Sequence, residues 1–165
     1  MRRTDRQITE AEARLLLEAG EFGVLSTVSA DGTPYGVPVN YCVMDGDIYF
    51  HSAPEGAKLD NLEHSPEVSF CVVGSTEVLP SRFGTKYESC VVAGRAIEVL
   101  GEGKRRALEC LVAKYSPGFE AEGLRHIERL QGKTRVFRIS VHSVSGKASP
   151  PRRAPGGRPT QTPEG

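Results

Sequence analysis

The sequence carries no surplus of either charge and no long apolar run. Its 21 basic and 21 acidic side chains balance, and no basic cluster stands out before the final residues, so we expect no nucleic-acid partner. The apolar stretches are too short to span a bilayer. Residues 1–6 are followed by acidic side chains rather than by an apolar segment, so we expect no signal peptide. These absences predict a cytoplasmic protein with no membrane partner.

Cysteine is scarce and scattered. The four cysteines are Cys42, Cys71, Cys90 and Cys110. They lie far apart, without the C-x-x-C pair that would indicate a redox or metal site, and each stands among valine, tyrosine or leucine. A thiol in such surroundings behaves as a small buried hydrophobe. We therefore expect no metal site and a reducing compartment.

The chain contains a succession of short strand patterns separated by turn signals. Asp31-Gly32 is typical of a hairpin turn, and Asp45-Gly46-Asp47 marks another. Strands are predicted at residues 24–28, 34–44, 48–52, 68–73, 87–100 and 135–141. Strands in hairpins, with helices inserted at the corners, favour a closed antiparallel sheet, which leaves no exposed edges. The predicted fold class is mainly β, an antiparallel barrel with peripheral α-helices.

Three local features refine this picture. Thr9 and Glu12 form a capping box for a first helix, which Gly20 is placed to end in a left-handed conformation. Pro34 and Pro38 lack backbone donors, so the second strand lies at an edge or against a ligand. Further helices are predicted at residues 55–62, 102–115 and around 124–130, and a bulge or bend at Gly94.

The length of 165 residues suits one domain with a single core. We place that domain at residues 1–148. Residues 149–165 are rich in proline and glycine and have nothing apolar to bury. We expect them to form a disordered tail.

One corner of the predicted barrel suits an anion. A strand ends at His51-Ser52, and a helix starts near Lys58. A helix start leaves backbone N–H groups free, and the serine hydroxyl and the lysine ammonium would add to them. Many helix starts have a serine and a lysine nearby and bind nothing, so these residues alone indicate a phosphate site only weakly.

Several ordered segments together resemble a known family. They are GVLST (23–27), DGTPYGVPV (31–39), IYFHS (48–52), KLDNL (58–62), TEVLP (76–80), YES (87–89), KYSP (114–117) and SGKA (145–148). The chain resembles the pyridoxamine 5′-phosphate oxidase-like superfamily of FMN-binding split β-barrels. Within it, the chain is most similar to the 5-nitroimidazole-resistance (Nim-type) reductases.

The resemblance implies a homodimer that holds FMN at the subunit interface. Pro38, Val39 and Asn40 would then lie along the isoalloxazine ring, while His51, Ser52 and Lys58 would lie near the ribityl phosphate. His51 would be the catalytic residue beside the flavin, although a structural role for this histidine remains open. The full set of expected cofactor-binding residues is Pro38, Val39, Asn40, His51, Ser52, Lys58, Asn61, Glu88 and Ser89, with Glu88 and Ser89 contributed by the partner subunit.

Two differences between this sequence and the vitamin B6 oxidases of the superfamily affect the activity that we expect. Vitamin B6 oxidases carry an arginine near the position of Val37 and a tryptophan near the flavin, and this sequence has no tryptophan. We therefore do not expect oxidation of pyridoxamine phosphate. The leading expectation is a reductase that passes electrons from NADH or NADPH, through FMN, to a small acceptor such as a nitroaromatic compound. The alternatives are a non-catalytic protein that binds flavin, deazaflavin or haem, and a cofactor-free interaction module.

Overall fold

The computed structural model describes residues 3–149. Its strands are β1 (Gln7–Ile8), β2 (Gly23–Val28), β3 (Pro34–Val39), β4 (Tyr41–Met44), β5 (Asp47–Ser52), β6 (Glu67–Leu79), β7 (Gly84–Glu98) and β8 (Arg135–Ser149). Its helices are α1 (Glu10–Ala19), α2 (Ala57–His64), α3 (Gly101–Tyr115) and α4 (Glu120–Leu130), with short 3-10 turns η1 (Thr4–Arg6), η2 (Pro80–Arg82) and η3 (Gln131–Lys133). Apart from Ser149, which ends β8, the predicted tail lies outside the described residues.

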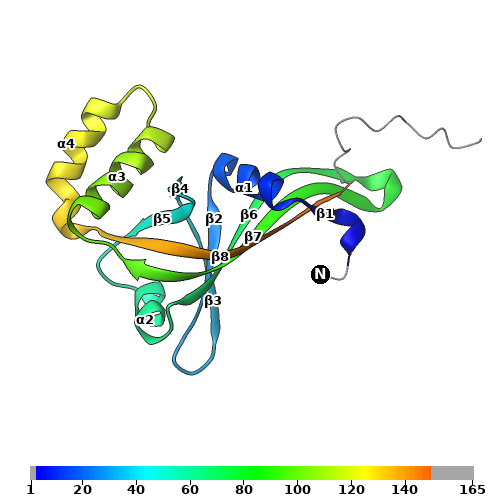
Figure 1. The fold of residues 1–165 in the computed structure, drawn as a ribbon, viewed down its shortest axis with the longest axis horizontal. Coiled ribbons are helices and arrows are strands. Elements are labelled where there is room, and N and C mark those ends of the chain that lie inside the picture. The colour runs from blue at the N-terminus through cyan, green and yellow to red at the C-terminus, as the bar shows by residue number, and fades with distance from the viewer. Residues whose placement is uncertain (1–2, 150–165) are drawn as a thin grey trace, which may run out of the picture.

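The strands form one antiparallel sheet that curls back on itself. Its order is β3-β2-β6-β7-β8-β5-β4, with β1 paired to β8. The two ends of this order, β3 and β4, are consecutive in the chain and are separated by Asn40 alone. The helices lie around the sheet, with α3 and α4 together at one end and the β6–β7 hairpin extending from the other (Figure 1). The predicted mainly β split barrel with peripheral helices is confirmed.

The barrel interior holds the main core. Side chains that alternate along the strands meet there and are almost fully excluded from water, among them Leu25, Ile48, Phe50, Phe70, Val72, Val92 and Ile139. A second cluster packs α3 and α4 onto the outer side of the sheet through Tyr49, Leu108, Leu111, Ile127 and Val136. Cys42 and Cys90 are buried as expected, whereas Cys71 and Cys110 are only half-buried. Burial raises the pKa of the Cys90 thiol to about 11. None of the helices in residues 3–149 has the length and apolar character that crossing a bilayer requires.

Two strands run further along the chain than predicted. The strand predicted to end at Val73 continues to Leu79, and the last strand continues from Val141 to Ser149. In the extension of β6 the side chains are mostly exposed on both faces, so no alternation marked it. The expected irregularity at Gly94 is confirmed, since the β7–β8 register shifts there and an added Cβ would lie 2.5 Å from the Ser140 carbonyl oxygen.

The N-terminal helix begins as predicted but ends differently. The Thr9 and Glu12 capping box is present. Gly20 is not left-handed, however, because its φ is −65° and its ψ is 139°. Glycine is needed there for close packing instead, since a Cβ would lie 2.4 Å from the Val72 Cγ1 and 2.7 Å from the Tyr41 hydroxyl oxygen.

We expect Gly20→Ala to lower the free energy of unfolding by about 1–3 kcal/mol, the usual effect of overpacking a core. Gly103→Ala is the matched control, because a Cβ there meets nothing closer than 3.9 Å in α3. That change should raise stability by about 0.5–1 kcal/mol through helix propensity. Urea denaturation of the purified proteins measures both changes. A Gly20→Ala protein as stable as the parent would contradict the close packing.

Candidate functional site

The barrel is open where β3 and β4 part. Before Asn40, β3 pairs only with β2, which confirms the edge position expected from Pro34 and Pro38. The β4–β5 ladder begins at the Tyr41 and Phe50 pair. His51 and Ser52 extend past that pair and are bonded to β8 alone. The predicted ring and phosphate residues therefore border the split in the barrel.

His51 and Ser52 face opposite sides of β5. Ser52 lies on the inner side with Ile48 and Phe50 and is buried. Its Oγ has no hydrogen-bond partner among the described residues. His51 lies on the outer side with Tyr49 and keeps contact with solvent. The two-residue period of a strand requires this separation, so the two side chains could contact one ligand only from different sides of the strand.

The start of α2 offers an uncompensated positive charge. Gly56 precedes the helix with a φ of 132°, and no side chain caps the first turn. Lys58 makes no ion pair with any carboxylate in residues 3–149. Asp60 is the acidic residue of that turn and is exposed. The exposed backbone of the first turn and the Lys58 ammonium suit an anion with several oxygens.

Asn61 has a structural role in this corner. Its side chain is buried, and its Nδ2 donates a hydrogen bond of 2.9 Å to the Thr27 hydroxyl. That hydroxyl in turn donates to the Tyr35 carbonyl over 3.4 Å. The chain of bonds ties α2 to β2 and β3, so Asn61 fixes where Lys58 stands.

The positive charge of Lys58 affects the pKa of His51. Loss of hydration lowers the pKa of the His51 imidazole below its ordinary value of 6.5, and Lys58 lowers it further by repulsion. We expect His51 to be neutral at pH 7 and Lys58→Gln to raise its pKa. In the unfolded chain the His51 imidazole has its ordinary pKa, whereas in the folded protein its pKa is lower. The contribution of His51 to stability is therefore complete above the ordinary pKa and is lost as the pH falls through the lower, folded-state pKa.

NMR titration of the imidazole resonances measures this prediction, with His51→Gln identifying the signal. The parent and Lys58→Gln are compared under the same conditions, so that only the substitution differs between the two titrations of His51. An unchanged His51 pKa in Lys58→Gln would show that the two groups do not interact.

Two neighbouring rows of side chains on the outer face of the sheet are uncharged. One row across β3, β2, β6, β7 and β8 consists of Pro38, Val24, Cys71, Val91 and Ser145. The next row consists of Gly36, Ser26, Ser69, Ala93 and Ser143. Val39 turns the other way and packs against the interior core. Of the predicted ring-lining residues, Pro38 therefore presents its side chain outward, and Val39 presents its backbone.

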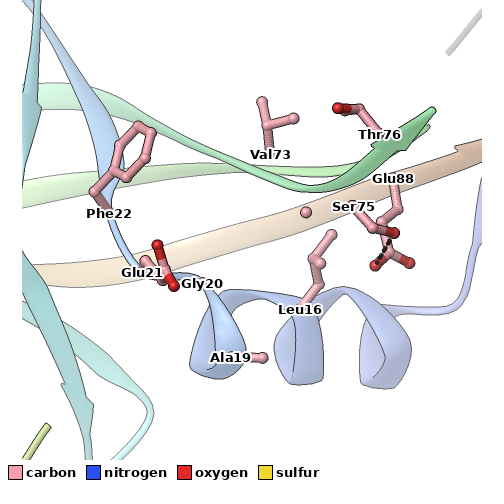
Figure 2. A pocket seen from close by; sticks show the side chains of 10 residues that line it. Leu16, Ala19, Gly20, Glu21, Phe22, Val73, Ser75, Thr76 and Glu88 are labelled. Carbon is pink, nitrogen blue, oxygen red and sulfur yellow. Dashed lines mark hydrogen bonds between the residues drawn. The ribbon is translucent and has the colours of Figure 1, made fainter. Parts of the chain in front are cut away.

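Glu88 and Ser89 lie elsewhere on β7. Glu88 lines a hollow of about 490 Å³ between the end of α1 and the irregular part of β6, here called the α1 hollow. Figure 2 shows Leu16, Phe22 and Val73 around it, with the Ser75 hydroxyl donating to the Glu88 carboxylate over 3.4 Å. The neighbouring Ser89 follows the strand alternation onto the outer face, in register with Val73.

A second hollow was not foreseen from the sequence. It measures about 340 Å³ and is lined by Asn40 and His51 from the barrel and by residues of α3 and α4, among them Leu111, Tyr115 and Ile127. We call it the α3–α4 hollow. The apolar stripes of both helices were visible in the sequence, but a stripe that lines a cavity looks the same as one that fills a core. The two hollows share no lining residue.

Tyr115 fastens α3 over the barrel split. Its hydroxyl accepts a hydrogen bond of 2.9 Å from the Tyr41 backbone N–H. The same oxygen lies 2.9 Å from the Tyr41 carbonyl and 2.5 Å from the Glu21 carbonyl, to which it can donate. These bonds hold the helix against the Asn40 junction and fix one wall of the α3–α4 hollow. Nothing local in the sequence indicated this contact, because it spans 74 residues of chain.

Comparison with known proteins places these features in a family. The family described as pyridoxamine 5′-phosphate oxidase matches residues 9–148. No curated protein sequence matches the chain.

Three solved structures illustrate the range of similar proteins. A candidate 5-nitroimidazole antibiotic resistance protein from Bacteroides thetaiotaomicron is 20% identical with a TM-score of 0.69, covering 86% of this chain and 85% of its own. An FAD-binding protein from Mesorhizobium loti is 27% identical with a TM-score of 0.61, covering 86% and 93%. The haem storage protein HutZ from Vibrio cholerae is 17% identical with a TM-score of 0.62, covering 82% and 92%. With a family match over nearly all of its described residues and this shared fold, the chain belongs to the pyridoxamine 5′-phosphate oxidase family.

Proposed function

We propose that this protein binds FMN in a site shared by two copies of the chain and acts as a flavin-dependent reductase of small acceptors such as nitroaromatic compounds. NADH or NADPH would be the electron donor. The observation that carries the proposal is the corner formed by the end of β5 and the start of α2, where Lys58 has no acidic partner among the described residues and Ser52 has an orphaned hydroxyl.

The residues of this corner fit a phosphate group. A buried hydroxyl without a partner costs free energy unless a ligand or water satisfies it. A phosphate oxygen would satisfy the Ser52 hydroxyl, while the Lys58 ammonium and the first backbone N–H groups of α2 would balance the charge. The family arginine is absent at Val37, so Lys58 would be the main cation for this group.

The outer sheet face supports the placement of the ring and of a second copy. The two uncharged rows through Val24 and Val91 could cover a flat aromatic ring or pack against another sheet without burying an unpaired charge. Glu88 lies in a hollow separate from that of His51 and Asn40. A cofactor that contacts all of these residues would need two copies of the chain.

FMN would supply the electron transfer when bound, and the chain would supply binding, orientation and a sheltered surface. His51, neutral at pH 7 and exposed on the outer side of β5, can donate one hydrogen bond and hold one proton close to the ring position. No nucleophile is required of the protein.

An absorbance scan of the purified protein, before and after addition of FMN, tests the proposal. We expect flavin bands that co-elute with the protein, and bleaching of these bands when NADH or NADPH is added without oxygen. Bound flavin that neither nucleotide bleaches would support a carrier instead. A Soret band would favour the haem alternative, with His51 as a candidate iron ligand. Colourless protein whose Tm does not rise with FMN would refute the flavin site.

A further inference from the structure

The α3–α4 hollow has the properties of a small-molecule pocket. Its volume of about 340 Å³ lies at the lower end of the range of about 300–1,000 Å³ that ligand pockets occupy. Apolar surface makes up most of its walls, and Leu108, Leu111 and Ile127 from the two helices contribute to it. A cavity of this size and lining accommodates a molecule of one or two rings.

The polar groups of the hollow are donors and neutral amides rather than acids. Asn40 and His51 project from the barrel, and His126 lies on α4. Arg129 donates to the Nδ1 of His126 over 3.2 Å, which places the proton of the neutral ring on Nε2. No carboxylate lines the hollow within the described part of the chain. The lining therefore favours a neutral ligand with hydrogen-bond-accepting oxygens and disfavours an ammonium cation.

The hollow also borders the proposed cofactor site. Asn40 and His51 belong to both, because they stand where the barrel splits and turn their side chains toward α3 and α4. Tyr115, held by its bonds to Tyr41, keeps the facing wall in place. An occupant of the hollow would thus contact the same two residues that the cofactor ring approaches from the barrel.

We propose that the α3–α4 hollow is the acceptor-binding pocket of this protein, and that it takes neutral one- or two-ring aromatic compounds carrying nitro or carbonyl oxygens. The assignment of the occupant as an electron acceptor rests on the proposed flavin function. The binding preference itself rests on the walls and donors of the hollow.

The test uses 4-nitroanisole as the probe and the purified full chain with isotope-labelled methyl groups. We expect the probe to shift the methyl resonances of Leu111 and Ile127 in a saturable manner. The cation benzyltrimethylammonium, which is of similar size, should bind at least tenfold more weakly. Absence of saturable shifts at these methyls, or equal binding of the cation, would overturn the proposal.

A matched pair of variants on α4 locates the binding. Leu130 lines the hollow, so Leu130→Trp should fill it and weaken 4-nitroanisole binding at least tenfold. Leu124 lies on the same helix, is 39% exposed and does not line the hollow, so Leu124→Trp should bind the probe like the parent. If circular dichroism shows that Leu130→Trp is folded and this variant still binds the probe like the parent, the assignment of the α3–α4 hollow as the binding pocket is wrong.

Parallel titration with FMN separates this inference from the proposed function. Probe binding without FMN binding would refute the flavin site and leave the aromatic pocket standing. FMN binding without methyl shifts from the probe would refute the pocket alone. When both bind, Leu130→Trp should raise the KM for the nitro compound at least tenfold and leave FMN affinity unchanged.

Discussion

Lys58→Ala should weaken FMN binding by about 10- to 100-fold. A hydrogen bond to a charged group is worth about 1.5–3 kcal/mol, and about 1.4 kcal/mol corresponds to a tenfold change in Kd. Lys58 has no competing carboxylate partner in residues 3–149. Residue 37 is a valine, so no arginine at that position can replace Lys58 as the cation. Quenching of flavin fluorescence on titration measures the affinity.

Riboflavin is the decisive control for Lys58, because it has the same ring without the phosphate. Its affinity should be equal in the parent and in Lys58→Ala. Lys104→Ala, a lysine loss in the first turns of α3, should leave FMN binding unchanged. If Lys58→Ala affects FMN and riboflavin alike, or neither, the phosphate corner is misplaced.

If the proposed dimer forms, Val91→Arg should convert it to a monomer and lower FMN affinity at least tenfold. Val91 is 43% exposed and belongs to the first of the two uncharged rows, between Cys71 on β6 and Ser145 on β8. A guanidinium packed there against a second sheet would be desolvated without a partner, which costs several kcal/mol. Sedimentation velocity at micromolar concentration reports the assembly state.

Ile97→Arg is the matched control for Val91. Ile97 lies on the same strand and the same face and is 42% exposed, so the two substitutions add the same charge at equal exposure. It stands near the Arg95–Glu67 ion pair, outside the uncharged rows. We expect it to leave the assembly state and FMN affinity unchanged. A dimeric Val91→Arg protein with normal FMN binding would remove this face from the proposed interface.

Much of the candidate site was accessible from the sequence. The order of strand, serine, lysine and helix at residues 51–58 suggested the phosphate corner, which stays a prediction. Pro34 and Pro38 indicated the sheet edge that the structure shows. The opposite orientations of His51 and Ser52 also follow from strand alternation. The structural role of Asn61 could not be predicted from the sequence, because its hydrogen-bond partner Thr27 is 34 residues away.

The amino-acid sequence by itself determined the elements whose signals are local. Alternating apolar residues specify the strands, and the Thr9–Glu12 capping box specifies the start of α1, because each depends on neighbours within a few residues. The tertiary structure alone decided that Gly20 is required for packing against Val72 rather than for its backbone angles. It also decided that the stripes on α3 and α4 enclose a hollow, since its walls come from segments that only the folded chain brings together.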